Sequence, residues 1–438
     1  MNKKITALLI ASLSALICGC SKTEATVAPH RHQFTTYWDS NSQTHFHICT
    51  FPGCGVRANI DDHVFDNEEL YDENYNIYKY CTFCGHKEFT GEVLPEFKLF
   101  NLPEIHYSYP DKIKEYLEME NPDPHGFPQL NQANGFRPLE VKWFSRRNDV
   151  HNYVIEYSRN SNFTDAIRVT LPSDATSYDI YNTYKNSTYY VRVTQNYGSN
   201  KSQSFVSTTR TTDMGPRLVR IDGISNTRDI GGYNTAAGRT LEGLAFRGTG
   251  LKVTGYQCLL TEKGIETFKQ LGVKTEIEFR PDSEAGDYDT LPHIENVNLE
   301  RHIIQGYSDV FNSKYTEAFR NVFKLFADKS SYPIYFHCSA GADRTGTVAF
   351  LLNALLGVDM MDLIHDFELT SFYEPGERNF SHSYDGDEYG KYMIEFMKNI
   401  NKVEGTSFYN KIENIMLNTI GITADDINSI RDIFYGRK

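Results

Sequence analysis

The feature that most constrains this chain of 438 residues is the ten-residue segment His337–Gly346, which reads HCSAGADRTG. An apolar run, Tyr332–Phe336, precedes it, and an apolar segment of helical length, Thr347–Gly357, follows it. The short run predicts a buried strand, and the longer run with its closing glycine predicts a helix. The segment therefore predicts a tight strand-to-helix turn that presents Cys338 at its start.

Small side chains make up this turn, in the order Ser339, Ala340, Gly341, Ala342 and Asp343. Successive backbone N–H groups of such a loop can converge on one point, where the start of a helix adds its partial positive charge. This cradle suits a phosphate group and favours the thiolate of Cys338, to which the Thr345 hydroxyl can donate. Arg344, six positions after the cysteine, can bind two phosphate oxygens with its guanidinium fork. The string predicts a nucleophilic cysteine, a phosphate-binding loop over 339–344 and a cysteinyl-phosphate intermediate, with no cofactor in the reaction.

Two simpler interpretations of Cys338 are a buried apolar cysteine in a tight turn and a sulfur carrier of the rhodanese type. Neither requires Arg344 followed by a hydroxyl residue. His337 is interpreted as a residue that orients the loop through hydrogen bonds, because a thiolate needs no base.

The region 215–438 alternates apolar strands with helices, which predicts an α/β domain whose mostly parallel sheet is covered on both faces. Its string HCxxGxxRTG resembles the cysteine-dependent tyrosine phosphatase superfamily. The region as a whole resembles the bacterial NFRDLGG-type tyrosine and lipid phosphatases, through NTRDIGGYNTAAGRTLEGLAFRGTGL (Asn226–Leu251) and LTEKGIETFKQLGVKTEIEFRPDSE (Leu260–Glu284). The resemblance implies a phosphatase acting on phosphotyrosine or on phosphoinositides.

The same resemblance implies that Asn226, Arg228 and Asp229 line or brace the site, although Asp229 can equally serve to lock a turn. The chain has Ala342 where the family often has lysine. That change removes a cation that would favour multiply phosphorylated headgroups.

Breaking the phosphate ester also needs a proton for the leaving group. Asp309 follows a predicted strand, where the family places a loop acid, and Asp343 lies inside the loop itself. The simpler roles are a helix cap for Asp309 and a brace of the loop for Asp343. We favour Asp309 and keep Asp343 as the alternative. Aromatic residues of the C-terminal region, among them Tyr373 and Tyr389, are candidate pocket walls.

The first twenty residues, MNKKITALLIASLSALICGC, place two lysines before an apolar segment, the order of a secretion signal. The segment is too short to span a bilayer. ICGCS at its end resembles the bacterial lipobox, which implies a signal peptide over 1–19 and lipidation of Cys20. A cleaved signal without an anchor and an ordinary N-terminal helix are the alternatives. We expect an exported chain, held at the cell envelope by lipid, with a polar tether over 20–33.

A small module over 34–95 is rich in cysteine and histidine. Its two cysteine pairs, Cys49 with Cys54 and Cys81 with Cys84, have the spacing of metal knuckles. The repeated HQF and HVF strings suggest that histidines such as His47 or His63 share or replace cysteine ligation. A structural zinc ion is favoured over two disulfides, which an exported chain could also form, and a redox role for the second pair has little support.

Between 122 and 213 the chain shows short alternating strands separated by polar turns, which predict a β-sandwich. This part resembles a fibronectin type III domain, with Trp143 at the place of the core tryptophan and Tyr189 as the corner tyrosine. We interpret it as a spacer rather than as a binding module.

A formal charge of −13 argues against a nucleic-acid partner. We therefore expect three modules, with a catalytic domain over 215–438 that acts on a phosphorylated protein at the cell envelope. The alternatives are a phosphoinositide or inositol-phosphate phosphatase, and a surface-binding protein whose phosphatase domain is inactive.

Overall fold

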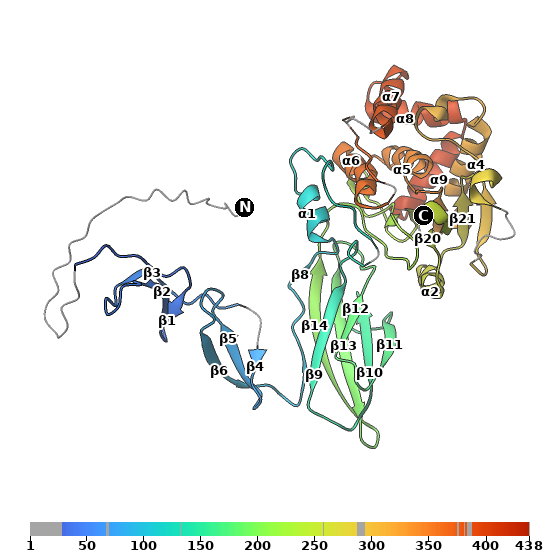
Figure 1. The fold of residues 1–438 in the computed structure, drawn as a ribbon. Helices are drawn as coiled ribbons and strands as arrows, with labels where there is room; N and C mark the ends of the chain where they lie inside the picture. The colour runs from blue at the N-terminus through green and yellow to red at the C-terminus, as the bar shows by residue number, and fades with distance from the viewer. Residues whose placement is uncertain are drawn as a thin grey trace. The chain divides into compact units, whose positions relative to one another are not determined.

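A computed structural model describes residues 29–66, 70–131, 133–256, 258–286, 294–374, 376–380, 382 and 388–437. The chain forms two compact units that divide after Glu96 (Figure 1). The expected signal peptide, Cys20 and most of the tether lie outside the described residues. Within the described part, no helix has the length and apolar character needed to cross a membrane.

The first unit consists of two small antiparallel sheets of three strands each. Their strands are β1 (Asp39–Ser40), β2 (Thr44–Ile48) and β3 (Arg57–Asp62), then β4 (Leu70–Tyr71), β5 (Asn76–Tyr80) and β6 (Lys87–Val93). Apart from two cysteines, the apolar side chains buried here are Phe46, Ile77 and Leu94. So small a core gives little stability by itself, which is why small domains of this size need a disulfide or metal staple.

The second unit begins with a β-sandwich. One sheet has the order β11-β10-β13-β14-β8 and the other has the order β12-β9-β7. The strands are β7 (Phe97–Leu99), β8 (Ile105–His106), β9 (Leu139–Ser145), β10 (Val150–Ser158), β11 (Ile167–Pro172), β12 (Ser177–Ile180), β13 (Thr188–Tyr197) and β14 (Lys201–Thr211). Inward-facing residues of both sheets, Trp143 among them, share one core.

The sandwich starts earlier than the boundary expected at 122. Strand β7 pairs with β9, and the Phe97 side chain is fully buried in the sandwich core. Strand β8 extends the other sheet by pairing in parallel with β14. Both strands are too short to show an alternating pattern, so the sequence offered no sign of them. Between them and β9 lies helix α1 (Asp111–Leu117).

The catalytic region contains a five-stranded sheet in the order β15-β18-β23-β21-β22. Its strands are β15 (Arg228–Asp229), β18 (Ala245–Gly248), β21 (Thr275–Glu278), β22 (Asn298–Arg301) and β23 (Ile334–His337). All neighbours run parallel except β15 and β18. The expected α/β domain with a mostly parallel sheet is confirmed.

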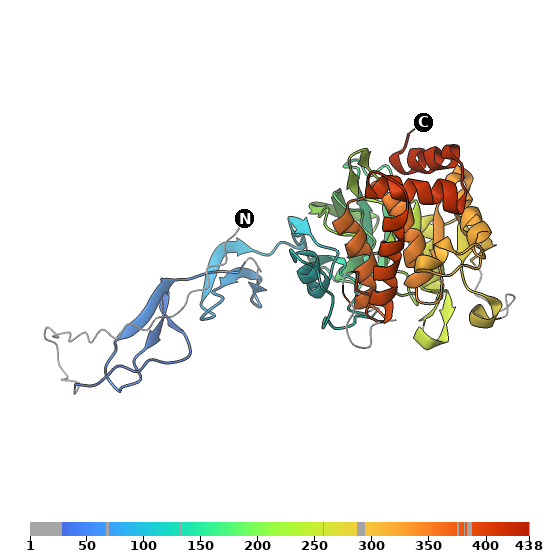
Figure 2. The same ribbon diagram turned by 90° about the horizontal axis from the view of Figure 1, so that it is seen from above.

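Helices cover both faces of this sheet (Figure 2). They are α2 (Glu262–Leu271), α3 (Asp282–Ala285), α4 (Thr316–Ala327), α5 (Asp343–Leu355), α6 (Met360–Glu368), α7 (Glu388–Lys402), α8 (Phe408–Asn414) and α9 (Ala424–Tyr435). Successive side chains of β23 point to opposite faces of the sheet, and a separate hydrophobic core lies on each face. Tyr335 meets Phe268 of α2 on one face, whereas Phe336 packs on the other face with α4 and α5.

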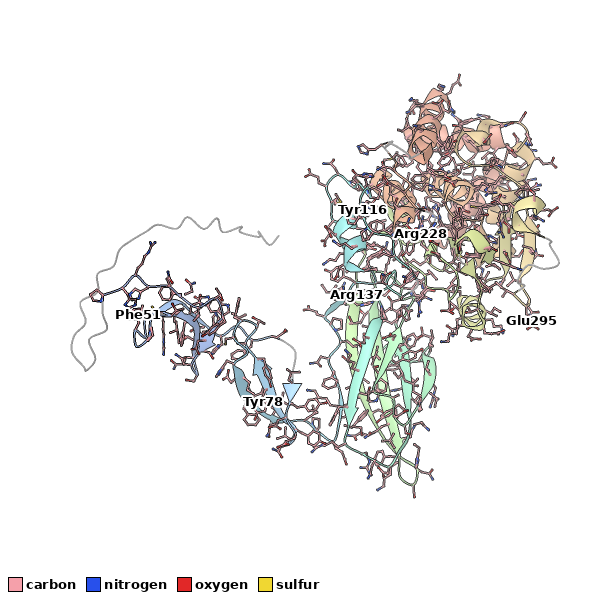
Figure 3. The ribbon with its side chains drawn as sticks, viewed as in Figure 1. Phe51, Tyr78, Tyr116, Arg137, Arg228 and Glu295 are labelled. Atoms are coloured by element: carbon pink, nitrogen blue, oxygen red, sulfur yellow. The ribbon has the colours of Figure 1, made fainter. Side chains whose placement is uncertain are left out.

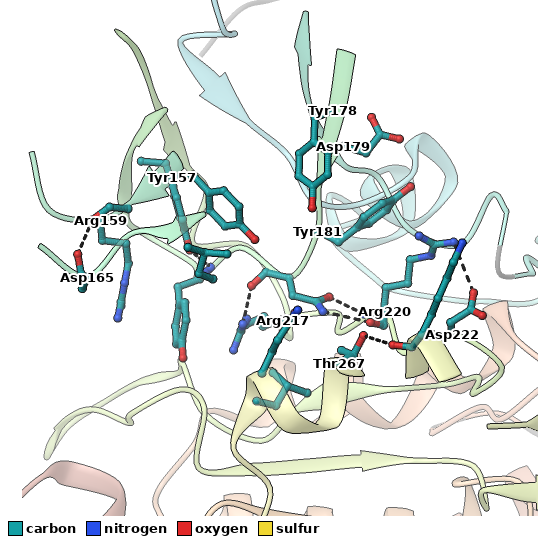
Figure 4. Close-up of a pocket in the computed structure, with 18 residues that line it drawn as sticks. Tyr157, Arg159, Asp165, Tyr178, Asp179, Tyr181, Arg217, Arg220, Asp222 and Thr267 are labelled. Carbon is teal, nitrogen blue, oxygen red and sulfur yellow. Dashed lines mark hydrogen bonds and ion pairs between the residues drawn. The ribbon is translucent and has the colours of Figure 1, made fainter. Parts of the chain in front are cut away.

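Arg217 ties the sandwich to the catalytic region. Its buried guanidinium donates to the backbone carbonyls of Asn182 and Thr183 and to the carboxylate of Asp229, and it stacks on Tyr184. A cavity of about 400 Å³ opens at this junction, with tyrosines and arginines in its walls (Figure 4). None of the residues 337–346 lines this cavity, so it is separate from the predicted site.

Candidate active site

The predicted strand, turn and helix are all present around Cys338. Strand β23 ends at His337, and α5 begins at Asp343, so the loop lies at the carboxyl end of a central parallel strand and at the start of a helix. The first N–H groups of a helix have no partner within the helix and can bind an anion. Cys338 is 1% exposed, and the Thr345 hydroxyl is buried without a hydrogen-bond partner among the described residues. That hydroxyl is therefore available to a thiolate.

Gly341 makes the close return of the loop possible. Its φ of +64° lies in the left-handed region, and a Cβ built there would stand 2.2 Å from the carbonyl oxygen of Gly248. Any side chain at this position would collide with the end of β18.

Two buried side chains hold the loop by its carbonyl groups. The Nδ2 of Asn226 donates to the carbonyl of Ala340 over 3.0 Å, and the Nη2 of Arg247 donates to the carbonyl of Gly341 over 2.8 Å. In a planar trans peptide the N–H points opposite to the C=O. Because Asn226 and Arg247 hold these carbonyls on the outer side of the loop, the N–H groups that follow them point to its inner side, where an anion can bind.

Asp366 of α6 accepts hydrogen bonds from two arginines that lie behind the loop, Arg228 and Arg247. Its Oδ1 accepts from the Nε of Arg228 over 2.8 Å, and its Oδ2 accepts from the Nη1 of Arg247 over 2.5 Å. Arg228, which is labelled in Figure 3, in turn donates to the Oδ1 of Asn226. Burial works against the ionised form of Asp366, but the charges of Arg247 and Arg228 hold its pKa below the ordinary value. The resemblance implied roles for Asn226 and Arg228, whereas Arg247 and Asp366 were not predicted.

Asp229, the third residue that the resemblance suggested, lies away from the loop. Its carboxylate accepts hydrogen bonds from Arg217 and from the N–H groups of Gly231 and Gly243. The structure therefore places it as the lock of a turn at the sandwich junction.

His337 lies in a buried charged cluster beneath the nucleophile. Its Nε2 is 2.8 Å from Oε1 of Glu276, and its Nδ1 is 3.3 Å from the carbonyl of Cys338. Burial alone would lower the pKa of His337, but the charge of Glu278 and the hydrogen bond to Glu276 raise it above the ordinary value. Both ring nitrogens thus face an oxygen atom, and the contact of Nδ1 helps to fix the first peptide of the loop.

Glu284 holds the arginine of the loop. Its carboxylate accepts from both terminal nitrogens of Arg344, at 2.7 and 2.5 Å, and also from the Ser339 hydroxyl. This fork-to-fork pair fixes the orientation of the guanidinium. Glu284 belongs to α3, directly after β21, and nothing in its sequence context distinguishes it from other surface acids.

The two candidate proton donors have different surroundings. Asp343 accepts hydrogen bonds from Arg378 and from the Tyr307 hydroxyl. Asp309 lies in a short 3₁₀ helix (Tyr307–Phe311), and the one hydrogen bond that its carboxylate accepts among the described residues comes from the side chain of Asn312 at 3.3 Å. Of the two, Asp309 is the carboxyl group with fewer bonds to cations.

A cavity of about 500 Å³ opens beside Arg344 and contains both acids. Its walls are formed by Gln305, Gly306, Tyr307, Ser308, Asp309, Asp343, Arg344, Tyr389, Tyr392 and Glu395. Tyr389 is therefore a pocket wall, as expected. The expectation for Tyr373 was wrong, because its ring is buried elsewhere and its hydroxyl donates to the carbonyl of Gly135.

The cysteines of the first unit form two groups instead of the expected single set. One group contains His30, His32, Cys49 and Cys54, and the other contains His45, His63, Cys81 and Cys84. His47, an expected alternative ligand, belongs to neither group, because its Nδ1 bonds the carbonyl of Tyr37 and its ring stacks on Trp38. His30 and His32 also place the start of the module before residue 34. No disulfide joins any two of the six described cysteines.

Taken together, the fold and the site define a cysteine-dependent phosphatase domain: a cysteine and an arginine enclose a loop of inward N–H groups at the end of a parallel strand. Residues 219–436 match the model of the tyrosine phosphatase family.

Two curated bacterial relatives are similar to this chain. A tyrosine-protein phosphatase of Nostoc commune is 28% identical over 138 residues, which cover 27% of this chain and 47% of that protein. A protein of Cupriavidus necator, named "Putative tyrosine-protein phosphatase", is 28% identical over 193 residues, which cover 38% of this chain and 66% of that protein. The chain thus spans about half to two thirds of the length of these relatives.

Among solved structures, the core catalytic domain of the PP-IP phosphatase SIW14 of S. cerevisiae matches with 12% identity and a TM-score of 0.22, over 37% of this chain and 91% of that one. A TM-score of this size carries no argument about fold or substrate.

Proposed function

We propose that the chain is a protein tyrosine phosphatase that hydrolyses phosphomonoesters through a cysteinyl-phosphate on Cys338. The anchoring of the loop carries this proposal. Asn226 and Arg247 hold two successive carbonyls from behind, so the N–H groups are preorganised for a phosphate before substrate arrives.

The reaction follows from this geometry in two displacements. The thiolate of Cys338 attacks phosphorus, the P–O bond to the substrate breaks, and Asp309 gives its proton to the leaving oxygen. Arg344 and the loop N–H groups hold the equatorial oxygens as charge redistributes. In the second step Asp309, now ionised, takes a proton from water as the water attacks phosphorus and releases the Cys338 thiolate with phosphate.

The walls of the cavity favour a phosphotyrosine substrate over a phosphoinositide. Tyr307, Tyr389 and Tyr392 offer aromatic surface to a substrate ring, while Glu395 brings negative charge to the same space. That charge, together with the absence of a lysine at position 342, works against a headgroup with several phosphates. A phosphoinositide or inositol-phosphate phosphatase remains the second candidate because the same loop binds any phosphomonoester.

The test uses the purified protein with p-nitrophenyl phosphate and with a panel of phosphotyrosine peptides, phosphoserine peptides, phosphoinositides and inositol phosphates. Cys338→Ser should abolish all turnover, whereas Cys258→Ser, which removes another buried cysteine, should leave it unchanged. Phosphotyrosine peptides should have the highest kcat/KM. Preference for a polyphosphorylated lipid would replace the proposed substrate, and full activity in Cys338→Ser would overturn the mechanism. A wild-type protein inactive on the whole panel would support the inactive surface-binding alternative.

We also propose that the enzyme is exported and lipid-anchored, and that its β-sandwich is a spacer domain. The lysine-then-apolar start and the ICGCS string support export and lipidation of Cys20. The strand order of the sandwich, the buried Trp143 and the Tyr189 hydroxyl, which accepts from the N–H of Tyr184, support a fibronectin type III-like spacer. Expression in a bacterial host should give a detergent-phase protein labelled by radioactive palmitate. Cys20→Ala should lose the label and leave the membrane fraction, and an unchanged distribution would exclude the anchor.

A further inference from the structure

We propose that the first unit binds two structural zinc ions, in two Cys₂His₂ sites that are linked through strand β2. The first site consists of His30, His32, Cys49 and Cys54, and the second consists of His45, His63, Cys81 and Cys84. Within each set, the four ligand atoms lie within 4.8 Å of one another. Two thiolates and two imidazoles around one point are a donor set that zinc prefers over the harder ions calcium and magnesium.

The distances between sulfur and nitrogen fit one ion in each set. The Sγ of Cys49 is 3.4 Å from Nε2 of His30, and the Sγ of Cys54 is 3.4 Å from Nδ1 of His32. In the second set, the corresponding distances are 3.6 Å for Cys81 with His45 and 3.5 Å for Cys84 with His63. Zinc bound to sulfur at about 2.3 Å and to nitrogen at about 2.0 Å in a tetrahedron separates the two atoms by about 3.5 Å.

The backbone builds the same frame at both sites. Phe34 pairs with Cys49 in an isolated bridge, and Phe65 pairs with Cys81 in the same way. The residue after each cysteine donates its N–H to the residue before each phenylalanine, Thr50 to Gln33 at 2.7 Å and Thr82 to Val64 at 2.8 Å. A ligand histidine stands two positions before each phenylalanine.

The two copies differ in the length of the cysteine loop, which is CxxxxC in one and CxxC in the other. What the copies share is the bridge and the ligand set. The bridge and the ligand set recur although the loops between the cysteines differ in length. This recurrence supports a common role for the four converging ligands at each site.

The surroundings of His63 are those of a metal ligand. Its Nε2 lies 2.8 Å from the carbonyl of Asn41, so this nitrogen carries the proton and donates it. The Nδ1 is then left with a lone pair that faces the thiol of Cys84. A histidine that binds a metal usually donates its other ring N–H to a carbonyl or carboxylate in this way.

Strand β2 joins the two sites. It carries His45, a ligand of the second site, and Cys49 of the first site follows directly after its end. The apolar core of the unit is small, so binding of either ion fixes a strand that the other site needs. We therefore expect the loss of one ion to weaken the retention of the other.

Metal analysis of the full mature chain, purified without chelators, tests the proposal. We expect two zinc ions per chain, and replacement by cobalt should give the absorption of tetrahedral thiolate-bound Co²⁺. Cys54→Ser should reduce the content to one ion or fewer, and Cys84→Ser should do the same. The matched control is His47→Ala, which removes a histidine of the same unit outside both sets and should leave two ions bound.

Hydrolysis of p-nitrophenyl phosphate in each variant reports that the second unit is folded, so a low zinc content cannot be ascribed to a collapsed chain. One ion in the wild-type chain, or two ions in Cys54→Ser, would overturn the two-site assignment. No metal, together with only two reactive thiols among the six described cysteines, would establish disulfides in its place.

Discussion

Arg378 holds both carboxylate oxygens of Asp343, with Nε 2.8 Å from Oδ1 and Nη2 3.1 Å from Oδ2. The Tyr307 hydroxyl donates a third hydrogen bond to Oδ1 at 2.6 Å. All three bonds hold the side chain of Asp343 in one orientation. Asp343 therefore braces the loop, and among the carboxyl groups that line the cavity we propose Asp309 as the general acid.

This division of roles predicts opposite behaviour for two conservative variants. Asp309→Asn should lower kcat by about 10²-fold or more for phenyl phosphate, whose leaving group needs a proton, and much less for p-nitrophenyl phosphate. Asp343→Asn, the matched control, should lower kcat by the same factor for both esters because it loosens the loop without removing the acid. A series of aryl phosphates of increasing leaving-group pKa measures the difference. A steep dependence for Asp343→Asn with a flat one for Asp309→Asn would reverse the assignment.

Arg247 provides the second prediction. Its guanidinium reaches Asp366 with one terminal nitrogen and the carbonyl of Gly341 with the other, and a lysine offers a single nitrogen for both. Arg247→Lys should lower kcat/KM for p-nitrophenyl phosphate by about 10²-fold, because the N–H groups of the loop lose their fixed direction. Arg431→Lys, in which a partly exposed arginine paired with Glu413 is changed, should stay within about twofold of the wild type.

Inhibition by vanadate separates orientation of the loop from a general loss of stability. The Arg247 variant should bind vanadate more weakly even at temperatures well below its unfolding transition. Unchanged vanadate affinity would mean that Arg247 acts on the fold alone.

Gly341 and Gly357 form a matched pair for the third prediction. Both have positive φ, of +64° and +79°, but a Cβ meets the Gly248 carbonyl at the first position and nothing within 4 Å at the second. Gly357→Ala should cost about 1 kcal/mol of stability and keep activity. Gly341→Ala should abolish measurable turnover, because the loop must shift to relieve the collision. Equal activities in the two variants would contradict this prediction, because they would show that the loop can move away from Gly248 without losing its function.

The sequence predicted the loop well because its parts are contiguous. Strand, cysteine, glycine, arginine and helix follow one another within about thirty residues, and each obeys a local rule of geometry. Arg247 and Asp366 could not be found in this way. They meet across 119 positions of sequence, and each is an ordinary charged residue in its own segment. Only the neighbouring position of β18 and β23 in the sheet brings Arg247 behind Gly341.

The cysteine module shows the same limit. The spacing of Cys81 and Cys84 is a local signal, and it correctly marked them as partners. The histidines that accompany them, His45 and His63, are 36 and 21 positions from the cysteine that each contacts, and strand pairing decides which histidine meets which cysteine pair. Without that register, His47 and His63 were equivalent alternatives, although they lie in quite different surroundings.

The fourth prediction concerns Glu368, which joins α6 to α1. Its side chain is buried, its Oε2 accepts from the Tyr116 hydroxyl at 2.6 Å, and its Oε1 accepts from the N–H of Phe380 at 2.7 Å. Burial outweighs these bonds and raises the pKa of Glu368 from 4.5 to about 7. The folded protein therefore binds a proton that the unfolded chain releases between these two pH values.

Stability falls with pH wherever the folded state holds more protons than the unfolded state. Glu368 should therefore lower the free energy of unfolding of the second unit by up to about 3 kcal/mol as the pH rises through that window. In Glu368→Gln the side chain is neutral throughout, so this loss of stability should vanish. The free energy of unfolding of the variant should therefore rise relative to that of the wild type from pH 5 to pH 8. Glu115→Gln, at an exposed position of α1, is the control and should parallel the wild type.

Urea unfolding followed by helical circular dichroism measures the effect, since every helix in the described part of the chain belongs to the second unit. The quantity of interest is the difference between variant and wild type at each pH, in which the titration of all other groups cancels. A difference that stays constant from pH 5 to pH 8 would show that Glu368 ionises normally. It would also show that the contact between α1 and α6 does not exclude water from the carboxyl group.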